Sequence, residues 1–250
     1  MSDPAPIPIS APRTGTDTMS SAMLEIPQYY RWMFSQFDRW LGNTVLDVGT
    51  GPGIHLPGLE GRRVLVADLS QECLDDVRRR FPGVETVRAD IADPAFALCM
   101  AGRGIDTITC LNVLEHIPDD SLALAGFCRI LGEGRGRLIL VVPAHQALYG
   151  DMDRLADHRR RYSLARLRGL LEASGFEILH ARHFNPAGGL AWYLNAKLLP
   201  VRDLSAPVVN GQIRVFALVL PAARAVDWLA CRVLRIPFGQ SLIAVARPRA

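Results

Sequence analysis

The stretch "VLDVGTGPGIH", Val45 to His55, decides how this sequence is interpreted. An apolar run typical of a buried strand leads directly into three alternating glycines, Gly49, Gly51 and Gly53. A glycine has no Cβ, so its backbone can approach a bulky group closely. The turn therefore holds a diphosphate or a nucleoside, or it is only a tight corner, and the surrounding residues must decide between these.

On both sides of this turn, apolar runs alternate with charged, periodic runs. Strands separated by helical segments are typical of βαβ units, whose parallel sheet is buried on both faces. We therefore predict an α/β fold with a seven-stranded, mostly parallel sheet and helices on both faces. The predicted strands are 44–49, 63–69, 84–91, 105–112, 136–143, 176–184 and 241–248, and the predicted helices are 71–81, 122–131 and one from an N-cap at Ser163 to Gly175.

Length and composition indicate one folded domain. The chain has 250 residues, of which 49% are hydrophobic, and this is enough for a single core. Residues 1–22 are rich in Pro, Ser and Thr and are predicted to form a disordered leader. The domain then covers 23–250. About 55 residues separate the last two predicted strands, far more than a hairpin needs, so 185–239 is predicted to be a helical lid or substrate insertion.

Composition also argues against several classes of protein. A formal net charge of +3 is too small to indicate a nucleic-acid partner. The 5 cysteines are scattered without a CxxC pair, which disfavours a disulfide framework or a zinc site and favours a reducing, cytoplasmic location. No acidic metal cluster is evident, so no metal ligand is predicted. The apolar stretch 213–234 is interrupted by charged residues and a proline, so no transmembrane span is predicted.

The acids around the glycine turn narrow its ligand. A dinucleotide fingerprint requires glycine at position 54, where this chain has Ile54, and no P-loop ending follows the turn. Asp47 precedes the glycines, and Asp68 and Asp90 end the next two predicted strands. Ligands bind at this edge of a doubly wound sheet, where a carboxylate accepts hydrogen bonds from ribose hydroxyls. Three acids favour a positively charged nucleoside over a diphosphate.

These features resemble the class I S-adenosylmethionine-dependent methyltransferases. The stretch "VLDVGTGPG" is similar to the first motif of that family, and Asp68 is similar to its ribose-binding acid. Residues 89–91 resemble its adenine-binding turn, and 110–120 resemble the segment after its fourth strand. The resemblance implies a Rossmann-like methyltransferase sheet, with S-adenosyl-L-methionine as cofactor and S-adenosyl-L-homocysteine as product. The cofactor-binding residues that it implies are Tyr29, Asp47, Gly49, Thr50, Gly51, Gly53, Asp68, Leu69, Asp90, Ile91, Asn112 and Val113.

Three further segments resemble a bacterial, small-molecule subset of the family. They are a "YNRW"-like lead-in at 29–32, the stretch from "VPAH" at 142–145 to "DHRRRY" at 157–162, and "PFGQSLIAVAR" at 237–247. Asp157 stands where the subset usually has glycine, which makes the geometry of that turn a specific question for the structure. The resemblance also implies that the lead-in helps to close over the methionine part of the cofactor.

The chemistry of methyl transfer points to histidines near the strand ends. A sulfonium is already a potent methyl donor, so the protein must mainly align the acceptor and exclude water. A general base is needed only for an acceptor that arrives protonated. His116 and His145 are the candidates, each with a structural role as the alternative, and a histidine base would ionise at about pH 6–7. Tyr149, His158, Tyr162 and Trp192 are predicted to border the acceptor pocket.

The predicted function is S-adenosylmethionine-dependent methylation of a small, apolar or natural-product-like acceptor in biosynthesis, with O-methylation favoured. No Asn-Pro-Pro-Tyr-like motif follows the fourth strand, which argues against methylation of nucleic-acid amino groups. The apolar residues of the lid fit an apolar ligand, and their alternative role is helix core and the contacts of a homodimer. The first alternative function is a scaffold or cyclase that binds the cofactor without methyl transfer. The second is an NAD-dependent oxidoreductase.

Overall fold

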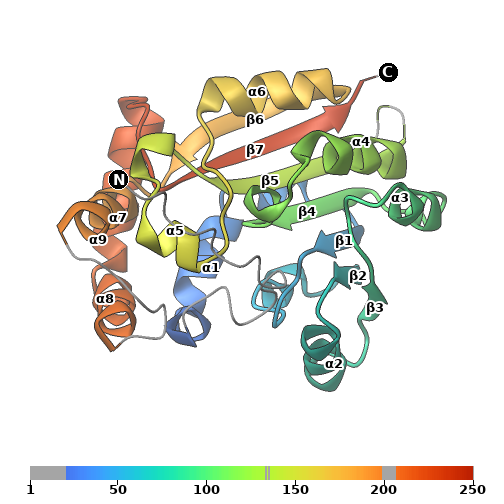
Figure 1. Cartoon of the computed structure of the whole chain (residues 1–250), viewed down its shortest axis with the longest axis horizontal. Helices are drawn as coiled ribbons and strands as arrows, with labels where there is room; N and C mark the ends of the chain where they lie inside the picture. Colours follow the sequence, from blue (N-terminus) through green and yellow to red (C-terminus); the bar gives the residue numbers. More distant parts are fainter. Residues whose placement is uncertain (1–20, 133, 135, 199–206, 250) are drawn as a thin grey trace, which may run out of the picture.

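The computed structural model describes residues 21–132, 134, 136–198 and 207–249, and its strands form one sheet in the order β3-β2-β1-β4-β5-β7-β6 (Figure 1). Strands β1 to β5 are parallel, whereas β7 lies between β5 and β6 and is antiparallel to both. The predicted seven-stranded, mostly parallel sheet is therefore confirmed. Its strands are β1 Thr44–Val48, β2 Arg63–Asp68, β3 Glu85–Arg88, β4 Thr107–Leu111, β5 Arg137–Pro143, β6 Phe176–Phe184 and β7 Ser241–Pro248.

Helices cover both faces of the sheet, as Figure 1 shows. Side chains of successive strand residues point to opposite faces, and both faces here are apolar. Ser163 caps α6 by accepting a hydrogen bond from the Arg166 N–H at 3.1 Å, which confirms the predicted N-cap. The helices are α1 Pro27–Phe34, α2 Gln71–Arg80, α3 Pro94–Met100, α4 Asp120–Leu131, α5 Asp151–Leu155, α6 Leu164–Ala173, α7 Pro186–Leu198, α8 Pro207–Leu218 and α9 Leu220–Asp227.

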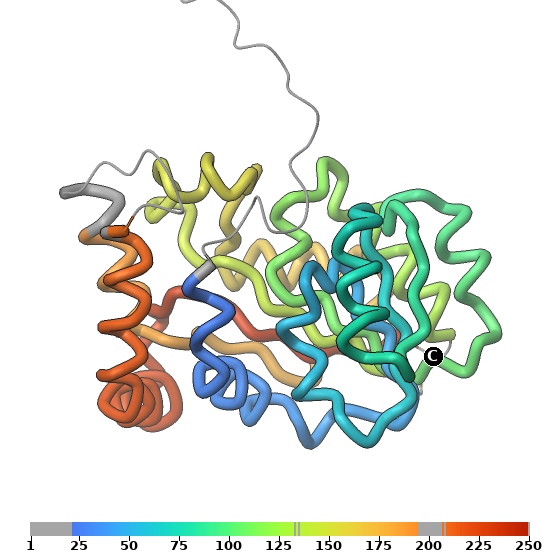
Figure 2. The backbone as a smooth tube through the Cα atoms, turned by 90° about the horizontal axis from the view of Figure 1, so that it is seen from below, coloured from blue at the N-terminus to red at the C-terminus, as the bar shows by residue number. Residues whose placement is uncertain are grey.

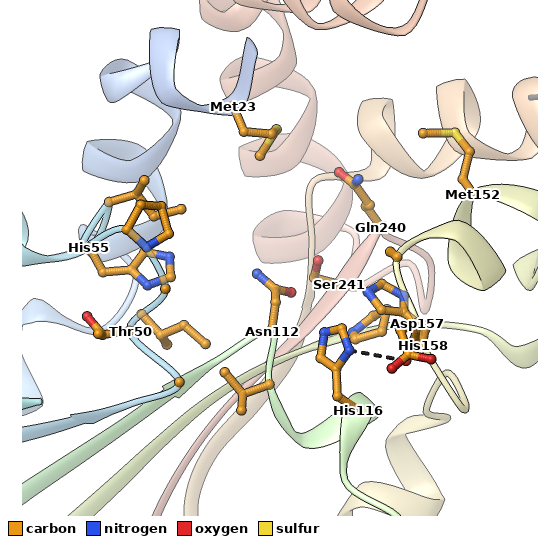
Figure 3. A pocket seen from close by; sticks show the side chains of 18 of the residues that line it. Met23, Thr50, His55, Asn112, His116, Met152, Asp157, His158, Gln240 and Ser241 are labelled. Carbon is orange, nitrogen blue, oxygen red and sulfur yellow. Dashed lines mark hydrogen bonds between the residues drawn. The ribbon is translucent and has the colours of Figure 1, made fainter. Parts of the chain in front are cut away.

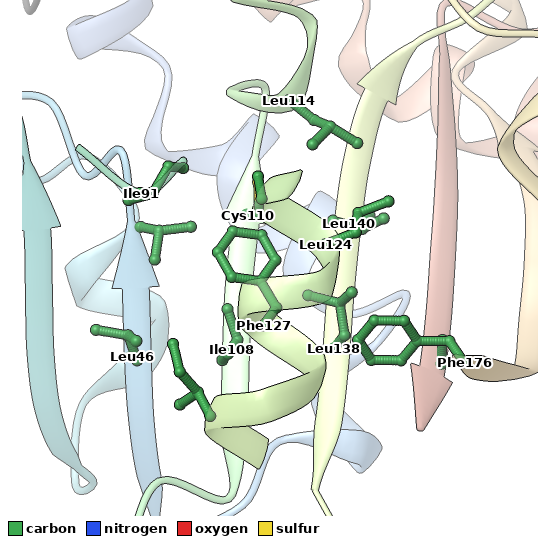
Figure 4. Close-up of a cluster of buried hydrophobic side chains, with 14 of the residues drawn as sticks. Leu46, Ile91, Ile108, Cys110, Leu114, Leu124, Phe127, Leu138, Leu140 and Phe176 are labelled. Carbon is green, nitrogen blue, oxygen red and sulfur yellow. The ribbon is translucent and has the colours of Figure 1, made fainter. Parts of the chain in front are cut away.

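The hydrophobic core lies in two layers, one on each face of the sheet. On the first face, Leu46, Ile108 and Leu138 pack against Phe127 of α4, and all four side chains are fully buried (Figure 4). On the second face, alternate strand residues such as Val66 pack against α1, α2 and α9. Burial on both faces explains why the inner strands of the sheet are largely apolar, whereas the edge strands β3 and β6 also carry charged residues.

The segment between β6 and β7 contains the helices predicted to form a lid. Helices α7, α8 and α9 gather at one end of the sheet in both views, and a π-helical turn, Trp228–Val233, continues α9 (Figures 1 and 2). Residues 199–206 of this segment lie outside the described residues. None of the described helices is long and apolar enough to cross a bilayer.

The start of the described chain differs in part from the predicted leader. Residues 1–20 lie outside the described residues, but Ser21 and Ala22 begin a 3-10 turn, Ser21–Glu25. Ala22 is fully buried, so it belongs to the folded domain. Strand β3 is also shorter than predicted. It ends at Arg88, which places Asp90 in the turn that follows the strand.

Candidate active site

A cavity of about 600 Å³ lies at the carboxyl ends of the parallel strands. The loop after β1 forms one side of it, and the segments after β4 and β5 form the other side, with the lid helices above. Figure 3 shows Thr50 and His55 on the first side and His116 and His158 on the second, with Asn112 between them. We call these sides the glycine-loop half and the histidine half.

The three glycines of the turn serve two different purposes. All three have positive φ angles, +65° for Gly49, +52° for Gly51 and +76° for Gly53. A Cβ on Gly49 would lie 2.4 Å from the Val113 side chain, and one on Gly53 would lie 3.0 Å from Leu56. A Cβ on Gly51 would meet no protein atom within 4 Å. Gly49 and Gly53 are therefore required by packing, whereas Gly51 borders open space in the cavity.

Asp68 connects the end of β2 to the glycine loop. Its Oδ2 accepts a hydrogen bond from the Gly51 N–H at 2.8 Å, and its Oδ1 accepts one from the Ser70 N–H at 2.8 Å. The residue is 8% exposed and lines the cavity. A carboxylate oxygen has two lone pairs, so each oxygen can still accept a hydrogen bond from a ligand hydroxyl. Asp68 thus positions the loop and offers acceptors to the cavity.

Further polar groups surround the glycine-loop half. Asp47 is buried beneath the loop, where its Oδ1 accepts a hydrogen bond from the Thr109 hydroxyl at 2.6 Å. Burial raises the pKa of the Asp47 carboxyl to about 6. Its Oδ2 and the Thr50 hydroxyl are buried without a well-formed hydrogen bond. Buried polar atoms of this kind are usually satisfied by a ligand or by water.

His116 is the leading side chain of the histidine half. Its Nδ1 lies 3.1 Å from the Asp157 carbonyl oxygen (Figure 3). Because a carbonyl only accepts, Nδ1 carries the proton and Nε2 keeps a free lone pair. Burial lowers the pKa of His116 to about 4, so the imidazole is neutral at pH 7. Asp157 has a φ of +58°, the left-handed conformation that favours glycine, which answers the question raised by its replacement of glycine.

A buried charge cluster supports the loop that carries His116. His158 Nδ1 lies 2.8 Å from Asp153 Oδ1, and Arg161 Nε donates to the same oxygen at 2.8 Å. His158 Nε2 lies 3.8 Å from Glu115, whose pKa burial raises to about 7. Glu115, His116 and His158 offer possible metal-ligand atoms within 4.8 Å of one another. Within the cluster, the buried Arg161 guanidinium forms an ion pair with the buried Asp153 carboxylate.

A match to a known protein family identifies the kind of protein to which this cavity belongs. A family model described as "Methyltransferase domain" matches residues 30–181, more than half of the chain. The chain belongs to the class I S-adenosylmethionine-dependent methyltransferase family. The predicted family is therefore confirmed, and S-adenosylmethionine is its cofactor.

Individual relatives of this chain match only part of it. A probable S-adenosylmethionine-dependent methyltransferase of Mycolicibacterium smegmatis is 28% identical over 144 residues, covering 56% of this chain and 54% of the relative. A ubiquinone biosynthesis O-methyltransferase of Azotobacter vinelandii is 39% identical over 85 residues, covering 32% of this chain and 36% of the relative. The chain thus spans about half, or less, of the length of these relatives.

One solved structure with a similar fold has a name that describes a different chemistry. The crystal structure of the [4+2]-cyclase SpnF has a TM-score of 0.55 and 17% sequence identity, covering 90% of this chain and 81% of that one. At that identity the likeness concerns the fold alone. The fold is therefore compatible with more than one kind of chemistry.

The residues of the cavity fit S-adenosylmethionine, the cofactor of the family. Gly51 leaves space for a close approach, and Asp68 offers acceptors for ribose hydroxyls. In the turn after β3, the Asp90 side chain accepts a hydrogen bond from the Ala92 N–H at 2.9 Å, which orders the turn beside buried Ile91. The predicted residues that line the cavity are Tyr29, Gly49, Thr50, Gly51, Asp68, Leu69, Asp90, Ile91, Asn112, Val113, His116, His158 and Trp192.

Five predicted residues lie outside the cavity lining: Asp47, Gly53, His145, Tyr149 and Tyr162. The His145 ring stacks with His183, at a centroid distance of 5.0 Å, and with Phe238, at 5.3 Å. The Tyr149 hydroxyl donates to the His158 carbonyl oxygen at 2.7 Å, and the buried Tyr162 hydroxyl donates to Asp120 at 2.9 Å. These three side chains hold the segments behind the histidine half and are not part of the cavity lining.

The structure also brings residues to the cavity that the sequence analysis did not select. His55 ends the opening stretch, is 5% exposed and contacts the Tyr30 ring edge-on. Its place directly after the glycines was the signal that could have identified it. Gln240 and Ser241 reach the cavity at the start of β7. They could not be found from sequence, because only the pairing of β7 with β5 brings them to the strand ends that border the cavity.

Proposed function

We propose that this methyltransferase transfers the methyl group of S-adenosylmethionine to an oxygen of a small, apolar or natural-product-like acceptor. The observation that supports this most is one cavity with a polar, cofactor-compatible half and an opposing half that carries His116, while apolar lid residues such as Ile213 and Phe216 also line it. The names of the M. smegmatis and A. vinelandii relatives support methyl transfer and oxygen as the receiving atom.

In this proposal the two halves align the reactants. S-adenosylmethionine supplies an electrophilic methyl group on its sulfonium. Asp68 accepts hydrogen bonds from the ribose, and the turn with Asp90 holds the adenine end. The lid residues Trp192, Ile213 and Phe216 cover the acceptor and exclude water. Alignment of this kind can supply several kcal/mol of the reduction in barrier.

His116 is our proposed general base. The acceptor oxygen gives its proton to His116 Nε2 and takes the methyl group as the carbon–sulfur bond breaks. The Asp157 carbonyl fixes the tautomer that leaves Nε2 free. A pKa of about 4 keeps the imidazole neutral but makes it a weak base. We therefore propose an acidic hydroxyl, such as a phenol or enol, in preference to an aliphatic alcohol. His145 stays a prediction, and its stacked ring favours a positioning role.

The test is release of S-adenosylhomocysteine in the presence of candidate acceptors. A panel should pair apolar phenols with the corresponding benzylic alcohols, each with methyl-labelled cofactor. We expect labelled ethers from the phenols and little product from the alcohols. Tight cofactor binding by calorimetry with no product from any acceptor class would contradict the proposal.

A second candidate function is a cofactor-binding protein that does not transfer the methyl group. The fold likeness to the [4+2]-cyclase SpnF favours keeping this alternative. It predicts acceptor conversion without S-adenosylhomocysteine release, at a rate that is the same with S-adenosylmethionine and with its demethylated product. The NAD-dependent alternative is set aside because the cofactor of the family is S-adenosylmethionine.

A further inference from the structure

The segment from α8 to β7 exposes large apolar side chains to solvent. Leu218 is 81% exposed, Trp228 and Leu234 are each 59% exposed, and Val233 is 50% exposed. Single exposed apolar residues are ordinary, but a concentration within one short segment usually marks an interaction site. The exposed apolar side chains of this segment therefore indicate an interaction site.

The continuous helix formed by α9 and the π-helical turn has one buried side and one exposed apolar side. One side is buried against the domain and consists of Leu220, Ala223, Asp227 and Cys231. Residues three or four apart lie near one another on a helix surface, so Val226, Leu229 and Val233 share the other side. These three residues are 46%, 49% and 50% exposed. An exposed apolar side on a helix whose other side is already buried is a candidate interaction surface.

The charges on this segment are positive. Arg224, Arg232 and Arg235 are exposed. The acid within 219–240 is Asp227, which is 2% exposed and pairs with Arg182 at 3.0 Å. The arginines therefore have no exposed acidic neighbour along the segment. An apolar stripe with tryptophan and flanking arginines is the pattern of a helix that lies in the interface of an anionic bilayer.

We propose that the outer side of Leu220–Val233, with Leu234 and Ile236, docks on the surface of an anionic lipid bilayer. The apolar side chains enter the headgroup boundary, and the arginines contact lipid phosphates while their stems cover apolar surface. A symmetric dimer through this face fits less well. A two-fold axis would bring the same three arginines of both copies together without acids to neutralise them.

The docking surface adjoins the cavity through α8. Ile213 and Phe216 of this helix line the cavity, whereas Val215 and Leu218 are exposed. Docking would therefore place one wall of the cavity at the bilayer surface, where apolar molecules concentrate. This inference goes beyond the proposed function, because the surface binds lipid whether or not the protein transfers a methyl group.

The experiment is co-sedimentation of the full chain with vesicles of phosphatidylcholine alone and with about one third phosphatidylglycerol. We expect binding to the anionic vesicles. This binding should weaken in 0.5 M salt, because a Debye length of about 3–5 Å screens the attraction between the arginines and the lipid phosphates. The double variant W228S/L229S should lower the partition coefficient at least about tenfold. Each of R224Q and R235Q should lower it about fivefold. L98S, which changes an exposed leucine of α3, is the matched control and should bind as the wild type does.

Two outcomes would overturn the proposal. One is that the wild type binds neither kind of vesicle. The other is a dimer in sedimentation equilibrium that W228S/L229S converts to a monomer, which would assign the face to a second copy of the chain. Unchanged S-adenosylmethionine affinity in W228S/L229S shows that the variant is folded. Because this affinity and product formation are measured separately from vesicle binding, failure of the proposed function and failure of this inference are distinguishable.

Discussion

The two halves of the cavity are held together in different ways. In the glycine-loop half, backbone groups and one carboxylate within a short stretch of chain fix the geometry, as the Gly51 N–H to Asp68 bond illustrates. In the histidine half, contacts between segments far apart in the chain do so, as in the contact of His158 with Glu115 and that of His116 with the Asp157 carbonyl oxygen. The first arrangement suits a cofactor of constant shape. The second can be changed residue by residue, as acceptor recognition requires.

The largest effect should come from the histidine half. We expect His116→Ala to lower kcat by about 10²–10⁴-fold, because it removes the proposed proton acceptor. Cofactor affinity should barely change, because His116 lies across the cavity from Thr50 and His55 of the glycine-loop half (Figure 3). His145→Ala is the matched control and should keep most of the rate. Full activity in the His116 variant would mean that catalysis relies on alignment alone.

The pH dependence of kcat is a second test of His116 as the general base. The ordinary pKa of histidine predicts an ionisation at about pH 6–7. Burial lowers the pKa of His116 to about 4, so the working neutral form is present at all higher pH values. We therefore expect kcat to stay level from pH 8 to about 5 and to fall only as the pH drops through about 4. A fall centred near pH 6.5 would identify a different, more exposed base.

The next effect tests the glycine-loop half. Gly51→Val combines a strained positive φ with a branched side chain in the ligand space, and we expect a loss of cofactor affinity of about 100-fold. Gly61→Val is the control, because Gly61 has a φ of +80° and no protein atom within 4 Å of its Cβ position, but lies outside the cavity lining. Both variants should lose stability, and only Gly51→Val should lose binding in calorimetry. Equal cofactor affinities in the two variants would refute a close approach at Gly51.

The same contrast explains which parts could be predicted from sequence. Gly51, Asp68 and Asp90 follow successive strands, so periodicity and turn chemistry were enough to bring them to one edge of the sheet. The contact between His158 and Glu115 depends on how the α5 region folds over β4, and no local pattern records that. His145 was selected because it directly follows β5, but its positive φ of +61° accompanies a ring stacked outside the cavity lining.

Burial of histidines should also make stability depend on pH. Burial lowers the pKa of His55 to about 4 in the folded chain, against about 6.5 when unfolded. Below pH 6.5 the unfolded chain binds a proton that the folded chain does not, so stability is full above 6.5 and is lost as the pH falls towards 4. The loss is at most about 3 kcal/mol. His55→Phe should flatten this part of the curve in urea unfolding measured from pH 7.5 to 4. His183→Phe is the comparison variant, because the pKa of His183 is also lowered to about 4 but His183 lies behind the histidine half.

The smallest effect separates the two roles of Asp68. Asp68→Ala should weaken cofactor binding by about 1–3 kcal/mol, because ribose hydroxyls lose their acceptor and the Gly51 N–H loses its partner. Glu60→Ala, at an exposed acid outside the cavity lining, is the control for a general loss of negative charge. Binding of 2′-deoxy and 3′-deoxy analogues of S-adenosylhomocysteine then isolates the direct contact. If Asp68 binds the ribose, one analogue should bind more weakly than the parent to the wild type and equally well to Asp68→Ala. If Asp68 only positions the loop, each analogue should lose the same affinity in both proteins, and the cost of the substitution should appear in the unfolding free energy of the ligand-free chain.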